Sequence, residues 1–64
     1  MDLKKIAAEV AATHGIDPDR MENGSFSIPE WQILYPLVEK VQQTQSEEDW
    51  RRYLEQKAKF LTGK

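Results

Sequence analysis

The order of apolar and polar residues predicts three α-helices. Apolar side chains recur three and four residues apart over residues 3–14, 28–44 and 47–62, which places them on one side of each helix. Gly15 and Gly63 stand where the first and last helices should end, because glycine adopts the left-handed backbone of a helix C-terminus without steric cost. We therefore expect an all-α fold.

A short extra helical turn is expected near residues 18–23. Asp17 supplies an N-cap, and Pro18 suits the first helical position because its missing N–H would be unbonded there anyway. Asn23-Gly24 is a strong pair of helix-breaking residues, so this helix should be brief.

Of the three expected helices, the one over 28–44 has the widest apolar arc. Ser27 and Glu30 form a capping-box sequence at its start. The apolar spacing continues through Pro36, which predicts a kink at this residue rather than the end of the helix. Its apolar residues span an arc of about 220° at 100° per residue, roughly twice what one neighbouring helix covers. We expect it to lie between the other two helices in a small three-helix bundle.

Length and composition indicate one small domain over residues 1–64. The chain has no cysteine, so disulfides and thiolate metal ligation are excluded. No stretch is apolar for long enough to cross a bilayer, and the N-terminal residues lack the pattern of a secretory signal. These observations predict a cytoplasmic protein that does not associate with membranes.

The charge distribution gives no sign of a phosphate-binding surface. Residues 1–46 carry four basic and seven acidic side chains, and residues 47–64 carry five basic and four acidic ones. A nucleic-acid or anionic-membrane binder needs a concentrated basic surface, so nucleic acid is an unlikely partner.

Catalytic chemistry has few candidates in this sequence. His14 is the only histidine, and its position on the apolar side of the last helical turn predicts a packed ring that interacts with the terminal carbonyls. No Ser/His/Asp arrangement, phosphate-binding glycine loop or paired-carboxylate motif is visible. We expect a protein that is not an enzyme and that uses no cofactor or metal.

Residues 19–30 resemble the calcium loop of EF-hand proteins. The matching positions are Asp19, Asn23, Gly24, Ser27 and Glu30. The resemblance implies a single calcium-binding unit, although Met21 replaces an oxygen ligand. The same residues also fit an Asn-Gly turn followed by a capping box.

The first part of the chain also resembles a helix-turn-helix unit. The small residue, turn glycine and two apolar core residues of that unit match Ala11, Gly15, Ile16 and Met21. The resemblance implies DNA binding through the helix that begins near Asp17, yet that helix carries three carboxylates and one arginine.

The last helix carries two lines of apolar residues. The first comprises Trp50, Leu54, Ala58 and Leu61, and the second comprises Tyr53 and Phe60, with Lys57 between the two lines. If Lys57 marks the edge of the core, Tyr53 and Phe60 project partly outward and form a protein-binding site with it. Alternatively, both rings widen the core, as both tryptophans are expected to do.

A small non-enzymatic protein–protein interaction module, acting as an adaptor, is therefore the function that the sequence favours. The partner would be another protein, or a second copy of the chain in a homodimer. DNA binding and calcium binding stand as the two alternatives.

Overall fold

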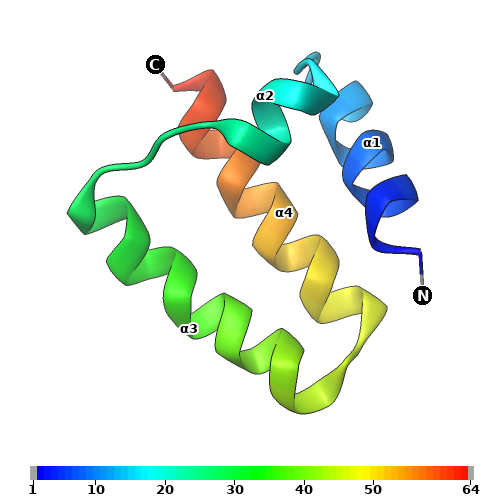
Figure 1. Cartoon of the computed structure of the whole chain (residues 1–64), viewed down its shortest axis with the longest axis vertical. Helices are drawn as coiled ribbons and strands as arrows, with labels where there is room; N and C mark the ends of the chain where they lie inside the picture. Colours follow the sequence, from blue (N-terminus) through cyan, green and yellow to red (C-terminus); the bar gives the residue numbers. More distant parts are fainter. Residues whose placement is uncertain (1, 64) are drawn as a thin grey trace.

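Four α-helices make up the computed structural model, which describes residues 2–63 (Figure 1). They are α1 (Leu3–Thr13), α2 (Pro18–Asn23), α3 (Ile28–Thr44) and α4 (Glu47–Thr62). The expected all-α bundle with a short extra helix is confirmed, and each expected boundary lies within one residue of the observed one.

Local hydrogen bonds explain where the helices begin. The Asp2 carboxylate accepts from the Lys5 N–H at 3.1 Å, and the Asp17 carboxylate accepts from the Asp19 N–H at 2.9 Å. Each bond satisfies an N–H that has no acceptor within the first turn of its helix. At the other end of α1, Gly15 adopts a φ of +68°, the left-handed conformation expected of it.

The start of α3 is a complete capping box. The Ser27 N–H donates to the Glu30 carboxylate at 2.8 Å, and the Glu30 N–H donates to the Ser27 hydroxyl at 3.4 Å. The helix then continues unbroken through Pro36, as its apolar spacing predicts.

The central helix is α4, and the expectation that 28–44 occupies the centre is wrong. Helix α4 packs against α1, α2 and α3, whereas within residues 2–63 α3 packs against α4 alone. Figure 1 shows α1 and α3 on opposite sides of α4, with α2 crossing near the C-terminal end of α4. The two apolar lines of α4 explain this arrangement, because a helix with two apolar lines can pack against two neighbouring helices.

Contacts along α4 show which line meets which neighbour. The Trp50 indole N–H donates to the Leu3 carbonyl at 3.3 Å, which joins the first line to α1. The Arg20 guanidinium donates to the Leu61 carbonyl at 3.2 Å, and a Cβ on Gly24 would lie 2.7 Å from a Leu61 methyl group. From the second line, Phe60 approaches Phe26, just before α3.

The helices form a flattened layer. The backbone measures 30 × 26 × 15 Å, so its shortest dimension is about half of the other two. Eleven apolar residues make up the buried core: Ile6, Val10, Ala11, Ile16, Met21, Leu34, Val41, Tyr53, Leu54, Ala58 and Leu61.

Helix α3 has only the middle of its apolar arc covered. Leu34 is fully buried, whereas Ile28, Ile33 and Tyr35 are 76%, 51% and 58% exposed. The width of the arc was interpreted as two covered sides, but α3 has one neighbour, so both edges of the arc face solvent.

Replacing Leu34 and Ile33 separately by alanine tests this one-sided packing. Leu34→Ala should lower the free energy of unfolding by about 2–5 kcal/mol, because it empties a fully buried site. Ile33→Ala, the matched control one residue earlier, should change it by less than about 0.5 kcal/mol. Urea denaturation followed by circular dichroism measures both values. Equal losses in the two variants would mean that both sides of α3 are covered.

Candidate protein-binding surface

The two broad sides of the helix layer differ in chemistry because opposite sides of α4 differ. Lys57 follows Glu48 by nine residues, which places the two side chains about 180° apart around the helix axis. We name one side the aromatic face, comprising Phe26, Trp31, Tyr35, Trp50, Tyr53 and Lys57. The other side is the charged face, comprising Glu9, His14, Glu47, Glu48, Arg51, Arg52 and Glu55.

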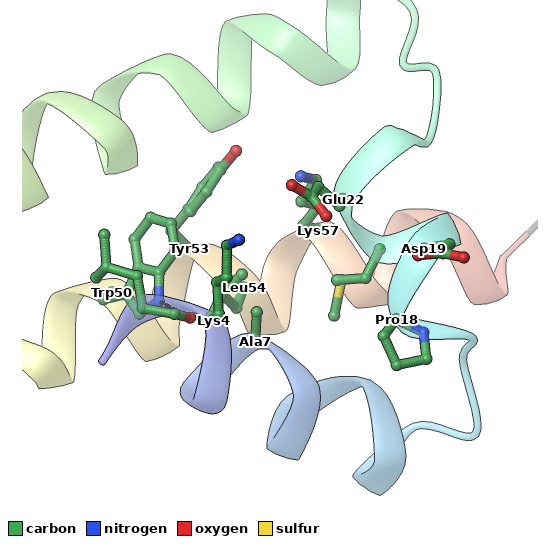
Figure 2. A pocket seen from close by; sticks show the side chains of 11 residues that line it. Lys4, Ala7, Pro18, Asp19, Glu22, Trp50, Tyr53, Leu54 and Lys57 are labelled. Atoms are coloured by element: carbon green, nitrogen blue, oxygen red, sulfur yellow. Dashed lines mark hydrogen bonds between the residues drawn. The ribbon is translucent and has the colours of Figure 1, made fainter. Parts of the chain in front are cut away.

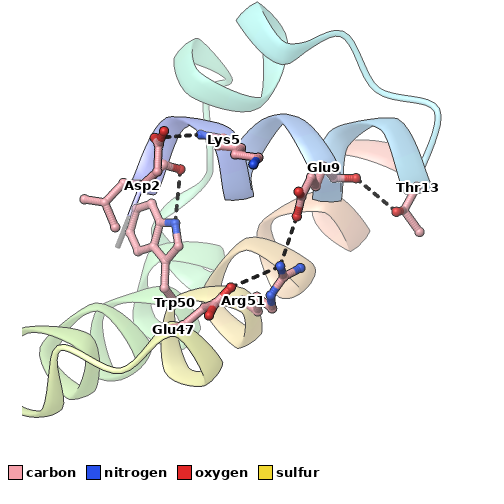
Figure 3. A network of polar contacts seen from close by, with 8 residues as sticks. Asp2, Lys5, Glu9, Thr13, Glu47, Trp50 and Arg51 are labelled. Carbon is pink, nitrogen blue, oxygen red and sulfur yellow. Dashed lines mark hydrogen bonds and ion pairs between the residues drawn. The ribbon is translucent and has the colours of Figure 1, made fainter.

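Ion pairs occupy the charged face. The Arg51 guanidinium lies 3.0 Å from the Glu9 carboxylate and 3.2 Å from the Glu47 carboxylate, which joins α4 to α1 (Figure 3). Arg52 pairs with Glu48 at 2.9 Å. In both pairs within α4 the acidic residue precedes the basic one by four positions, the spacing that favours an ion pair on a helix surface. The pKa of Arg51 is raised because Glu9 and Glu47 both accept hydrogen bonds from its guanidinium.

His14 belongs to this charged face and has a different partner from the one expected. Its Nε2 lies 2.6 Å from a Glu55 carboxylate oxygen, so the ring connects the end of α1 to α4. The expected interaction with the terminal carbonyls of its own helix is replaced by this contact between helices. Residue spacing could not show it, because Glu55 is 41 positions away.

The aromatic face is a continuous strip of ring contacts. Trp31 stacks on Tyr35 with 5.2 Å between ring centroids, and Phe26 meets the edge of Trp31 at 5.5 Å. Lys57 Nζ lies 5.8 Å from the Phe26 ring centroid and 5.7 Å from that of Tyr53, within the range of a cation–π interaction. Tyr53 in turn lies 5.4 Å from Trp50. The strip therefore runs from α3 across α4.

A groove of about 420 Å³ lies along this strip, between α1 and α2 on one side and α4 on the other (Figure 2). It is lined by Leu3, Lys4, Ala7, Pro18, Asp19, Met21, Glu22, Trp50, Tyr53, Leu54 and Lys57. Figure 2 shows Lys4 nearer to the Trp50 end of the groove and Asp19 at the α2 end. An apolar floor with a few charges at its edge is typical of a site for an amphipathic partner.

The three residues predicted to bind protein lie together, but they do not all project outward. Tyr53 is 8% exposed and belongs to the core, so for this ring the interpretation as a wider core is confirmed. Phe60 is half-buried against the core. Lys57 is half-buried and, with Tyr53, lines the groove. A binding role for the three stays a prediction.

Burial shifts the pKa values of two groups in the groove in opposite directions. It raises the pKa of the Tyr53 phenol, because the charged phenolate loses hydration there. It lowers the pKa of the Lys57 ammonium for the same reason, and the Glu22 carboxylate partly offsets this effect. An incoming carboxylate at Lys57 would therefore meet a cation that is incompletely hydrated.

Sequence reasoning missed the exposed part of the aromatic face. Trp31 and Trp50 were expected in the core, yet both are only partly buried against it. Ile28 and Tyr35 were assigned to packing and are exposed. The available signal was the arc of about 220° on α3, which is more apolar surface than one neighbour can cover.

The structure shows what the segments that resemble an EF-hand loop and a helix-turn-helix unit form. Asp19 and Asn23 lie within helix α2, and Glu30 completes the capping box, which confirms the expected cap. The expected Asn-Gly turn is not formed, because α2 ends at Asn23 and Gly24 is extended with φ −62° and ψ 145°. Among residues 2–63, no group of three or more histidine and carboxylate side chains could hold a metal ion. Asp17, Asp19 and Glu22 are exposed on the short α2, where they would repel a phosphate backbone.

Comparison with known proteins adds no relative. No family model matches the chain, and no curated protein and no solved structure matches it. Within the described range, none of the helices has the length and apolar character needed to span a membrane.

Replacing Tyr53 by phenylalanine should change how stability depends on alkaline pH. The pKa of Tyr53 is raised above 10.0 in the folded protein, so as pH rises the phenol loses its proton in the unfolded chain first. This ionisation favours the unfolded state. The contribution of Tyr53 to folding is therefore complete below pH 10.0 and is lost as pH rises from there through the raised pKa.

The free energy of unfolding of Tyr53→Phe minus that of the original chain should therefore increase from about pH 9 to about pH 11. Lys57 remains in both proteins, so its opposite effect cancels in this difference. Urea denaturation of both proteins at the two pH values measures the difference. A difference that is independent of pH would show that the Tyr53 phenol is not held in a dehydrated site.

Proposed function

We propose that this protein is a non-enzymatic protein–protein interaction module that binds its partner on the aromatic face. The proposal rests on one observation, the strip of ring contacts that ends in the exposed side chain of Tyr35, with the exposed Ile28 two turns earlier on the same side of α3. Aromatic residues next to a cation are typical of the residues that dominate binding energy at protein interfaces.

The shape of the aromatic face supports a helical partner. The groove lies between α4 and the pair of helices α1 and α2, and the exposed edge of α3 lies on the other side of α4. An amphipathic helix placed there would cover both the groove and the exposed side chains of α3. The predicted residues Tyr53 and Lys57 would contact it from below, with Phe60 supporting the rings.

The remaining parts of the proposal concern how and where the module acts. A small module without a catalytic constellation would act as an adaptor, by holding a partner rather than by changing it. The absence of cysteine is compatible with the reducing cytoplasm. The partner is another protein or a second copy of this chain.

Affinity capture from a lysate of the source organism tests the proposal. The baits are the original chain and the double variant Ile28→Gln, Tyr35→Gln, which removes exposed apolar groups while keeping good helix-forming residues. We expect proteins retained by the original chain to be reduced at least about tenfold on the variant, as identified by quantitative mass spectrometry.

A third bait, Glu48→Gln with Arg52→Gln, is the matched control. It removes an exposed ion pair on the charged face, which contributes little to stability. It should retain what the original chain retains, and circular dichroism should show all three baits equally helical. The proposal fails if the Ile28/Tyr35 variant keeps the same proteins, or if the Glu48/Arg52 variant loses them.

A further inference from the structure

The groove beside α4 has the size and lining of a small-molecule site. Its volume of about 420 Å³ lies within the range of about 300–1,000 Å³ found for ligand pockets, which are lined mainly by apolar side chains with a few polar groups. Met21 and Leu54 line the groove from the core, and Ala7 and Trp50 pack against that core. Most of the wall is therefore apolar.

Lys57 is the charged residue that distinguishes this groove. The other charged residues of the lining lie on α1 and α2 and are exposed, so water screens their charges. Lys57 is half-buried, and its Nζ lies 5.8 Å from the Phe26 ring centroid and 5.7 Å from that of Tyr53. Within residues 2–63 it forms no ion pair. Burial lowers its pKa, and the Glu22 carboxylate offsets this effect only in part, so the ammonium group is incompletely hydrated.

This ammonium group restricts what the groove can bind. An uncharged apolar molecule would remove more water from the ammonium group without replacing its hydrogen bonds, which costs free energy. A cationic molecule would in addition meet a like charge. A carboxylate replaces the lost water with a charge-assisted hydrogen bond. Asp19 and Glu22 repel further negative charge at the α2 end of the groove, so one carboxylate fits better than a phosphate group or two carboxylates.

We infer that the groove binds a small molecule in which an apolar tail carries one carboxylate, with the carboxylate at Lys57. Figure 2 shows Lys57 near α2 and Trp50 toward the other end, with Leu54 and Ala7 between them. The tail therefore lies along Leu54 and Ala7 toward Trp50, where its apolar surface is removed from water. This ligand site goes beyond the proposed function, because the exposed edge of α3 lies on the other side of α4.

Titration of the full ¹⁵N-labelled chain with hexanoate, followed by NMR, tests the inference. The amide signals of Ala7, Met21 and Leu54 should shift and saturate with a dissociation constant below about 10 mM. Hexanol and hexylammonium share the tail and should bind at least about ten times more weakly, because neither supplies a carboxylate to Lys57. Equal affinity for the three molecules, or no saturation by hexanoate, would overturn the inference.

Two lysine variants test the role assigned to Lys57. Lys57→Gln should weaken hexanoate binding at least about tenfold. Lys59→Gln is the matched control, because it removes the same charge from an exposed position of α4 outside the groove, and it should bind hexanoate like the original chain. Circular dichroism checks that both variants are helical. Equal losses in the two variants would mean a response to net charge alone and would contradict the inference. If Lys57→Gln does not fold, the comparison of hexanoate with hexanol on the original chain still decides.

The position of the shifted signals and one further variant separate this inference from the proposed function. Shifts confined to the exposed edge of α3, at Ile28 and Tyr35, would place hexanoate outside the groove and overturn the ligand site. The variant Ile28→Gln, Tyr35→Gln keeps every residue of the groove, so it should bind hexanoate like the original chain even though it loses captured proteins. Failure of hexanoate to bind therefore leaves the interaction module standing, and failure of protein capture leaves the ligand site standing.

Discussion

The structure depends on α4 serving as a shared packing surface for every other helix. Leu54, Ala58 and Leu61 of its first apolar line lie in the core, and its second line places Tyr53 there as well. With α1 and α3 on opposite sides of α4, of the described helices only the short α2 crosses α4, near its C-terminal end, and a groove beside α2 stays open. A single central helix can hold three helices together, but it cannot enclose them. The exposed groove and the exposed edge of α3 are both consequences of this one constraint.

The two open sides of the layer are stabilised in different ways. On the charged face, Arg51 and His14 connect α1 to α4 through carboxylates, so polar side chains cover that side while remaining exposed to water. On the aromatic face, rings cover the core and Lys57 lies between two of them. Charged pairs at a surface contribute little net free energy, whereas exposed rings lose unfavourable contact with water when a partner covers them. This difference is why we propose the aromatic face, and not the charged face, as the binding surface.

Local chemistry made the helix boundaries predictable, whereas the packing order depended on information that the sequence pattern lacks. Asp2, Asp17 and Ser27 act on groups within three residues of themselves, so their roles could be inferred from spacing alone. The arc of α3 gave the amount of apolar surface but not how much of it a neighbour covers. The same limit applies to Phe26, which lies outside any periodic stretch and contacts Lys57 31 positions later. His14 and Glu55 are a third example, since only the folded chain brings them together.

Lys57 shows how far the placement of the predicted residues could be inferred. A lysine within an apolar arc was interpreted as a possible edge of the core, and the half-buried Lys57 does lie there, where the core meets the groove. Of the two interpretations of the neighbouring rings, outward or part of the core, Tyr53 follows the second, and Phe26, from the segment before α3, takes the outer position beside the ammonium group. Lys57 therefore lies at the edge of the core, and its two aromatic partners, Tyr53 and Phe26, come from two parts of the chain. For a partner, this means that the surface to be recognised is built jointly by α3, α4 and the loop before α3, and that it exists only once α3 has packed against α4.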